Sequence, residues 1–462
     1  MELSDTQGGM LEEYLQPYHT LMGDLRTWVT FRETVKGIIA AGSLVCQRIA
    51  AHSQRLSCAH EGGQRVSRLA RGESTKRSQV DAETLTRVLR ERGLEHLAGT
   101  DSDALWLIAD LSEVRKPYAR AMPDLMQVCA LDGSLVPGYR SVNVLGITPS
   151  RRGILYHRLF SSQEQDFLSE SREIQVALQT VSQAVAALPQ QMVITWIMDS
   201  GFDDIAVWRT IWEQGEHLVC RLKHLERLVA YREVQGQWIE GHLQEAIPLL
   251  ELLATAQTEM VVQRKGQARP KRQEVRAEIR ATPLRVTYET QVRREGTGKI
   301  AQQMVWLVEV RLRGTSLDPW YLLTDWPVMD AEQALTIFRM YRQRWAVEDS
   351  FRFLKDTLGW EEVQLLNLQG IRTLLALGWV AAGFLYELGI SLEWEEVQLL
   401  ARLGGWADRK NNKPGKIVLT RGLRRLLDLL VTQALLDRYR AENGHLPPRI
   451  AALLPPSPPD HL

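Results

Sequence analysis

Cysteine is scarce in this chain of 462 residues, which contains Cys46, Cys58, Cys129 and Cys220 and no C-x-x-C pair. Scattered free thiols suit a reducing compartment, whereas a small secreted scaffold would carry closely spaced cysteines. An excess of either charge is also missing, because 56 basic residues balance 56 acidic residues. A polyanionic partner would therefore have to be bound by local basic patches rather than by the charge of the whole protein.

Targeting and membrane segments are the next features that the sequence lacks. The N-terminus has no basic start followed by an apolar core, so it does not predict a signal peptide. The longest apolar run, LLALGWVAAGFLYELGI (374–390), is slightly short for a membrane span and contains Glu387. This run predicts a buried core helix. Together these features predict a cytoplasmic protein with no membrane partner.

The first hundred residues predict helices that carry many basic side chains. Residues 46–92 contain twice as many basic as acidic residues. A segment of this kind is either a solvated helical surface or a DNA-binding module, and its composition leaves both readings open.

An alternation of strand and helix patterns follows from residue 104. Three apolar, β-rich runs come first, then a stretch of helical periodicity, a strand, a second helix and a further strand. The segments are 104–114, 141–148, 153–162, 166–188, 192–199, 204–215 and 217–223. This order matches a ribonuclease H-like core, in which helices flank a mixed sheet.

The second half of the chain predicts a largely β insertion and then helices. β-rich and basic stretches alternate after residue 224, and the strand PWYLLTDW (319–326) ends them. The predicted fold class is α/β, with a ribonuclease H-like mixed sheet core, a β-rich insertion, and N- and C-terminal helical regions. The predicted divisions are a helical DNA-binding region (1–100), the core's first part (101–223), the insertion (224–318), the core's second part with the catalytic helix (319–370), a C-terminal helical region (371–445) and a proline-rich tail (446–462).

The segment YRQRWAVEDSFRFLK (341–355) is unusual because charged residues recur at helical spacing among large apolar ones. At 100° per residue, five of its polar side chains fall within an arc of about 80°. They are Tyr341, Arg344, Glu348, Arg352 and Lys355. A solvated helix face is the ordinary explanation of a charge run, but such a face rarely needs Tyr and Trp beside it.

Three carboxylates stand in related places. Asp110 ends or interrupts the first predicted strand, Asp199 ends the fourth, and Glu348 lies on the helix after the insertion. Converging carboxylates can hold two Mg²⁺ ions, which stabilise the attacking and leaving oxygens of phosphoryl transfer. Asp132 also follows an apolar run and competes for the first position. We prefer Asp110 because two strands should follow the strand that carries the first carboxylate.

The spacing Tyr341-x2-Arg344-x3-Glu348-x6-Lys355 resembles the tyrosine, arginine, glutamate, lysine signature of DDE transposases of the IS-four (insertion sequence four) family. The resemblance covers about residues 104 to 370. It implies that Asp110, Asp199 and Glu348 are catalytic and hold two Mg²⁺ ions, with Mn²⁺ as a substitute. It further implies double-stranded DNA as the partner, both element ends and target, and a homodimer that pairs two ends.

The resemblance also implies an activity and a set of DNA contacts. The enzyme would hydrolyse a phosphodiester at the element's end and join the freed 3′-hydroxyl to target DNA through a hairpin intermediate. Tyr341, Arg344, Arg352 and Lys355 would contact the phosphates. Trp320 would stack on a base flipped out of the helix, whose extrusion costs a few kcal/mol. Packing in the sheet core is the alternative for Trp320, and helix packing the alternative for Tyr341.

Two departures from the family pattern leave other functions open. Leu111 follows Asp110 where Thr or Ser is common, and Ser200 follows Asp199 where the family has arginine. A catalytically silent DNA-binding regulator and a structure-specific nuclease are the alternative functions. Asp203 and Asp204 are predicted to cap the next helix rather than to bind metal. Basic clusters at 264–280 and 408–416 either follow the DNA backbone or form solvated surface.

Overall fold

The computed structural model describes residues 3–53, 59–100, 102–130, 132–233, 235–262, 271–290, 300–407 and 413–451. They fall into two units, each described here by itself. The helical unit comprises the described residues of Met1–Val88, Arg120–Pro123 and Arg352–Leu462. The sheet unit comprises those of Leu89–Ala119 and Asp124–Phe351. Parts of both predicted basic clusters (264–270 and 408–412) and most of the proline-rich tail (452–462) lie outside the described residues.

The sheet unit is built around β1 (Ala104–Arg115). This strand pairs antiparallel with β3 (Leu135–Ile147) and parallel with β5 (Val193–Met198). Beyond them, β4 (Arg152–Phe160) pairs antiparallel with β3, and β6 (His217–Arg221) pairs parallel with β5. Each predicted strand of the first part of the core is therefore present, and the short β2 (Met126–Cys129), which was not predicted, pairs with β3.

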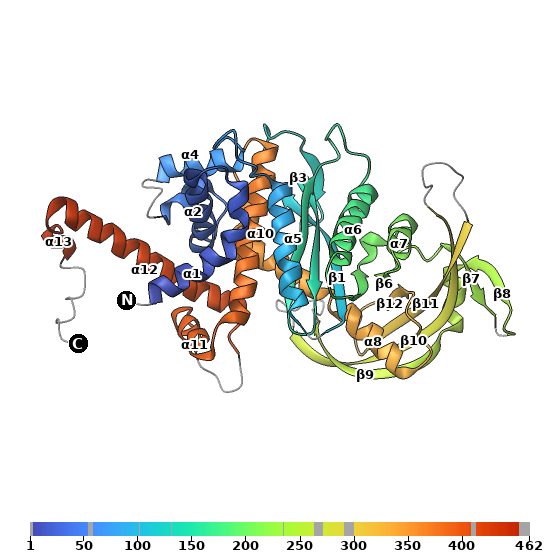
Figure 1. The fold of residues 1–462 in the computed structure, drawn as a ribbon. Coiled ribbons are helices and arrows are strands. Elements are labelled where there is room, and N and C mark those ends of the chain that lie inside the picture. Colours follow the sequence, from blue (N-terminus) through green and yellow to red (C-terminus); the bar gives the residue numbers. More distant parts are fainter. Residues whose placement is uncertain are drawn as a thin grey trace. The chain divides into compact units, whose positions relative to one another are not determined.

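The later strands extend this sheet. β12 (Trp320–Thr324) pairs with β6, and β11 (Ile300–Arg313) with β12. β10 (Lys271–Glu289) pairs with β11, and β9 (Glu251–Val262) pairs with β10. Both strands are long and curved (Figure 1). The hairpin of β7 (Leu228–Arg232) and β8 (Trp238–His242) also joins β10. Among the described residues, one twelve-stranded sheet results, so the β-rich segment continues the core sheet.

The two faces of the sheet carry different helices. α6 (Glu170–Ala186) and α7 (Ile205–Trp212) bury one face, and their apolar side chains form a core with alternate residues of β1, β5 and β6. α8 (Ala331–Arg342) contacts β5, β6, β9 and β10 (Figure 1). Side-chain caps fix the helix starts: Ser169 Oγ accepts the Arg172 N–H at 3.1 Å, and Asp330 accepts the Gln333 N–H at 2.9 Å.

The segment that was expected to form one helix across 341–355 consists of three pieces. α8 ends at Arg342, α9 spans Trp345–Arg352, and a π-helical turn covers Phe353–Thr357. Between α8 and α9, the N–H groups of Gln343 and Arg344 donate to carbonyl oxygens three residues earlier, which tightens the turn. The five polar positions therefore do not lie on one regular α-helical face, and the single-helix expectation is wrong.

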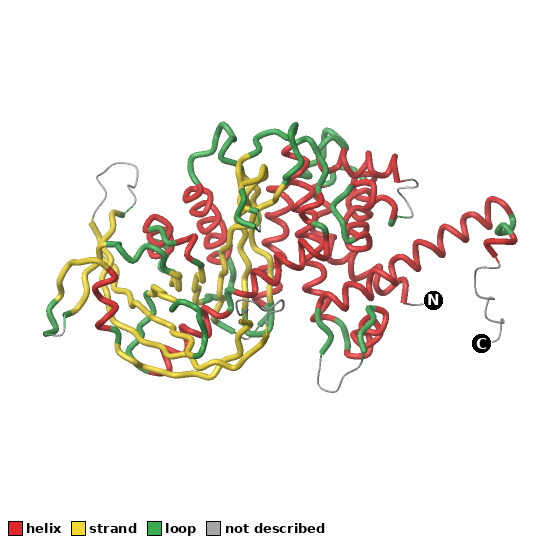
Figure 2. The backbone as a smooth tube through the Cα atoms, turned by 180° about the vertical axis from the view of Figure 1, so that it is seen from behind, coloured by secondary structure: helices red, strands yellow, loops and turns green. Residues whose placement is uncertain are grey.

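The helical unit joins elements from both ends of the sequence. Its helices are drawn in red in Figure 2. α2 (Leu25–Ala41) contacts α10 (Leu368–Ser391) and α12 (Lys416–Asn443), and α4 (Ala59–Ala70) also contacts α10. α10 is long and apolar enough to cross a membrane by length and composition, but 78% of its apolar window is buried within the protein. The predicted buried core helix is therefore present.

Candidate active site

Asp110 lies in the middle of β1 rather than at its end. It pairs in register with Asn143 of β3, so the strand continues through it. Leu107 and Ala109 belong to the core beneath α6 and α7. Because successive side chains of a strand point to opposite faces, Asp110 projects from the other face, the one that α8 approaches.

Asp199 reaches the same face from the neighbouring strand. It directly follows β5, and its extended backbone (φ −87°, ψ −174°) continues the alternation. Trp196 and Met198 are buried in the core under α6 and α7, so Asp199 points away from it. Ile108 and Ile197 pair in parallel register, and each aspartate lies two residues further on. Asp110 and Asp199 therefore lie side by side.

Glu348 lies on α9 and forms an ion pair with Arg344, one helical turn before it. The distance from Arg344 Nη2 to Glu348 Oε1 is 2.7 Å. The Arg344 side chain is 12% exposed and the Glu348 side chain 39% exposed. The glutamate is therefore accessible, and the arginine is held beneath it.

The three carboxylates act on one another electrostatically. The pKa of Asp110 is raised to about 8, most strongly by burial and next by the negative charges of Asp199 and Glu348. The Arg344 guanidinium and the Leu111 N–H, which donates to Asp110 Oδ1 at 2.9 Å, oppose this rise in the pKa. Asp110, Asp199, Arg344 and Glu348 thus form one electrostatic cluster within the sheet unit.

This cluster has suitable donors for divalent cations but is not arranged as a complete metal centre. Within the described ranges, no three His, Cys, Asp or Glu side chains are grouped to hold a metal ion. Carboxylate oxygens are the ligands that Mg²⁺ prefers. A cation would also relieve the like-charge repulsion that raises the pKa of Asp110. The donor set therefore fits Mg²⁺, provided that Glu348 turns away from Arg344.

Asp132, the alternative first carboxylate, lies in the exposed turn between β2 and β3. It accepts hydrogen bonds from the Ser134 N–H at 3.0 Å and the Ser134 hydroxyl at 2.7 Å. These bonds lower the pKa of Asp132. Asp132 thus has the geometry of a turn residue. Asp110 is the aspartate whose pKa is raised by the charge of Asp199.

Tyr341 and Trp320 are packed together on the α8 side of the sheet. Tyr341 is 2% exposed and Trp320 6% exposed, and their ring centroids lie 5.5 Å apart in an edge-on arrangement. Burial raises the pKa of Tyr341 to about 12, while the guanidinium groups of Arg344 and Arg221 act to lower it. Both aromatic residues would have to be uncovered before they could contact DNA.

Arg352 and Lys355 belong to the helical unit rather than to the sheet unit. Arg352 is exposed, and Lys355 Nζ lies 3.0 Å from Glu361 Oε1. The structure therefore brings Tyr341, Arg344 and Glu348 of the signature together with the two aspartates, and it places Arg352 and Lys355 in the other unit.

Asp203 has a role that the sequence did not predict. Asp204 caps α7 by accepting the Ala206 N–H at 2.8 Å, as expected. Asp203 does not cap this helix, because its side chain, 1% exposed, is turned toward the loop after β6. There it accepts from the N–H groups of Lys223 and His224 and from the Arg227 guanidinium. Its position in the run DSGFDD (199–204) gave no signal that separated it from Asp204.

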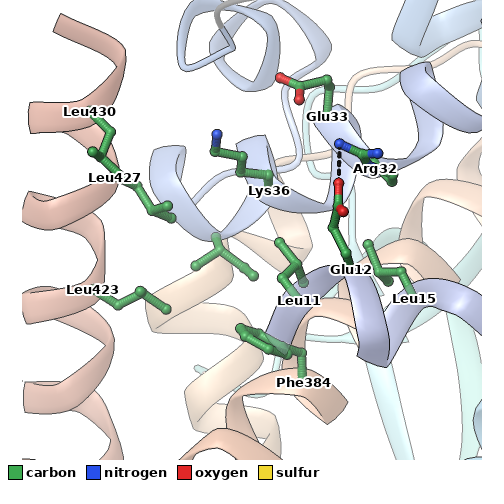
Figure 3. Close-up of a pocket in the computed structure, with 11 residues that line it drawn as sticks. Leu11, Glu12, Leu15, Arg32, Glu33, Lys36, Phe384, Leu423, Leu427 and Leu430 are labelled. Atoms are coloured by element: carbon green, nitrogen blue, oxygen red, sulfur yellow. Dashed lines mark ion pairs between the residues drawn. The ribbon is translucent and has the colours of Figure 1, made fainter. Parts of the chain in front are cut away.

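A pocket in the helical unit has a different character. It has a volume of about 120 Å³ and lies among α1 (Leu3–Leu15), α2, α10 and α12 (Figure 3). Leucines and Phe384 line it, and the Glu12–Arg32 ion pair lies at its edge. None of the three candidate carboxylates lines this pocket.

Residues 172–382 match the model of a family described as the transposase DDE domain. This match supports a DDE transposase. The matched DDE domain contains Asp199 and Glu348, and Asp110 precedes its first residue. The match covers less than half of the chain, and it does not distinguish the IS-four family from other DDE transposases.

No curated protein matches the chain. Among solved structures, similarity is found to a chain in the "Cryo-EM structure of piggyBac transposase synaptic complex with hairpin DNA (SNHP)". The identity is 10% and the TM-score 0.35, and the alignment covers 77% of this chain and 58% of that one.

Proposed function

We propose that this protein is the DNA transposase of an insertion sequence, of the IS-four type, with a ribonuclease H-like catalytic core. The strand order β4-β3-β1-β5-β6, with antiparallel β3 and parallel β5 and β6, supports such a core. The family match supports a transposase. The Tyr341, Arg344, Glu348 and Lys355 spacing supports the narrower family.

One observation carries the catalytic part of the proposal: Asp110 and Asp199 project side by side from one face of the sheet, and Glu348 acts on Asp110 from α9. Asp110, Asp199 and Glu348 would hold two Mg²⁺ ions, or Mn²⁺ in their place, and bound ions would stabilise charge on the attacking and leaving oxygens. Arg344, released from Glu348, would donate its guanidinium N–H groups to a DNA phosphate. Tyr341 would keep Arg344 in position through packing.

The proposed substrate is double-stranded DNA, first the element ends and then the target. A phosphodiester at each end is hydrolysed, and the freed 3′-hydroxyl attacks the opposite strand, which gives a hairpin on the element end and releases the flanking DNA. A second hydrolysis opens the hairpin and regenerates the 3′-hydroxyl, which then attacks a target phosphodiester and displaces the target strand's 3′-oxygen. Two protomers pair two ends in this scheme, with the C-terminal helices as their contact. Arg352, Lys355 and the basic 1–100 region would bind the DNA backbone, and the location in the cytoplasm stays a prediction.

Incubation of the purified protein with Mg²⁺, a plasmid target and labelled DNA taken from the flanks of its gene tests the proposal. Joined product is expected. Cleavage without joining would point to a structure-specific nuclease, and binding without cleavage to a silent DNA-binding regulator; either result contradicts the proposal.

Glu348→Gln is the informative variant in this assay. Glutamine keeps the size of the side chain but removes the charge that would bind Mg²⁺, so cleavage should be abolished while DNA binding is largely retained. Asp132→Asn is the matched control and should cleave like the wild type. Full cleavage by Glu348→Gln would show that Glu348 is not a ligand of the metal ions.

A further inference from the structure

Arg221, the last residue of β6, lies beside Asp199. Met198 of β5 and Cys220 of β6 pair in register, and both are buried in the core under α6 and α7. Because strand side chains alternate between the faces, the next residue of each strand points away from that core. Asp199 and Arg221 therefore project from the face on which Asp110 and α8 lie.

Arg221 is near the aromatic pair as well. It pairs in register with Leu322 of β12, and Trp320 lies two residues earlier in that strand. The ring of Tyr341 packs edge-on against Trp320, and the charge of Arg221 opposes the rise in the pKa of Tyr341 that burial causes. The guanidinium of Arg221 thus lies at the border of the cluster formed by Asp110, Asp199, Arg344 and Glu348.

Arg221 lacks the partners that the neighbouring arginines have. Arg344 is paired with Glu348, and Arg227 is paired with Asp203 and lies over the Trp208 ring at 4.3 Å. Arg221 is half-buried and makes no ion pair or side-chain hydrogen bond with any residue that the structure describes. A guanidinium has five N–H donors in a rigid fork, and partial burial without an anion is unfavourable. This position is suited to an anion from outside the protein.

The backbone that follows Arg221 is held firmly. Asp203 accepts the N–H groups of Lys223 at 2.6 Å and His224 at 2.8 Å, and the Arg227 guanidinium at 2.5 Å. Asp203 is only four residues after Asp199, so it connects the end of β5 to the loop after β6. A binding group is more effective when its supporting shell is fixed in this way.

We propose that Arg221 is a phosphate-binding residue of the active site, which grips the DNA backbone beside Asp199 while Asp203 fixes the end of β6. This inference rests on the proposed function, since it takes DNA as the substrate. Three carboxylates at the site repel a phosphodiester, and a bidentate guanidinium on the same face offsets that repulsion. Arg221 is a positioning group for the phosphate and transfers no proton.

Salt-dependent binding of a short fluorescein-labelled DNA duplex, measured by anisotropy without divalent ions, tests this assignment. Each phosphate contact adds about 0.9 to the slope of log K against log salt concentration. Arg221→Gln should therefore bind more weakly and lose about 0.9 of the slope. Arg221→Lys should keep the slope because it keeps the charge, but bind more weakly because it lacks the fork.

Arg232→Gln is the matched control, because Arg232 ends β7, which β12, β11 and β10 separate from β6 in the sheet. It should keep the wild-type slope. An unchanged slope in Arg221→Gln, with wild-type binding in Arg221→Lys, overturns the role of Arg221 and leaves the transposase proposal standing. Failure of the wild type to bind the duplex at any salt concentration contradicts the proposed function itself. Circular dichroism of each variant verifies the fold, and Arg221→Lys provides the comparison if the glutamine variant is misfolded.

Discussion

The carboxyl group of Asp110 links the site to the pH dependence of folding. Its pKa is about 8 in the folded protein, against an ordinary value of 3.8. Between these values the folded state binds more protons than the unfolded state, so the free energy of unfolding falls as pH rises. We expect the metal-free protein to lose stability between about pH 4 and pH 8 through this group. Thermal melts in a chelating buffer over this range measure the effect.

The variant Asp110→Asn isolates this contribution, because the amide does not titrate. The difference in stability between variant and wild type should grow as pH rises toward 8 and then level off. Asp132→Asn is a useful control, since the pKa of Asp132 is lowered by Ser134 and its contribution should instead be lost as pH falls. A pH-independent difference between Asp110→Asn and the wild type would contradict the burial of this carboxyl group.

Trp320 offers a second prediction for a single residue. Its indole is buried and packs against Tyr341 and Phe338, with ring centroids 5.5 and 6.5 Å away. Trp320→Ala should therefore lower the free energy of unfolding by about 3–5 kcal/mol. Denaturant titration measures this loss. Trp320→Phe keeps an aromatic ring, so its free energy of unfolding should fall much less. It is therefore the better variant for comparing hairpin formation with first-strand nicking.

At the scale of single elements, the sequence predicted strands better than the helix that carries Glu348. Alternation and β-branched residues identified β1, β3, β4, β5 and β6, because their pattern is local. The break between Arg342 and Trp345 has no glycine or proline to indicate it. At this break Tyr341 packs against Trp320 of β12, which is a tertiary contact that a local pattern does not report.

Because α11 (Trp394–Leu403) and α12 pack closely, we expect a glycine at their contact to be sensitive to substitution. A Cβ atom on Gly422 would lie 1.9 Å from the carbonyl oxygen of Leu400, which is backbone and has little freedom to move. Gly422→Ala should destabilise the helical unit by about 1–3 kcal/mol or more. Gly389→Ala is the control, because nothing lies within 4 Å of its added methyl group. Chemical denaturation should show the control unchanged or slightly more stable.

At the scale of the whole molecule, the division into units could not be predicted from local patterns. The N-terminal helices and the helices after Arg352 form one unit, although hundreds of residues separate them in sequence. The predicted divisions, which name residues 1–100 and 371–445 as separate regions, stay a prediction. Periodicity identifies an element and its apolar face but not the partner of that face. For the same reason, Asp110 and Asp199 could be proposed from their strands, whereas Arg221 and Asp203 could not be recognised as parts of the site.

Two compact units should unfold in separable steps. Differential scanning calorimetry is expected to show more than one transition. Gly422→Ala should shift only the transition of the helical unit, and Trp320→Ala only that of the sheet unit. A single transition moved equally by both variants would indicate that the units unfold cooperatively.

The burial of α10 by the early helices also bears on what a shortened gene for this protein would produce. Residues of α2 and α4 cover a 24-residue segment that is otherwise apolar on nearly every side. A gene that has lost its first eighty or so codons would still encode this segment, but α10 of its product would be an exposed apolar helix. Such remnants should precipitate or be degraded, so 5′ truncation removes the protein altogether, whereas point changes at the carboxylates leave a folded one.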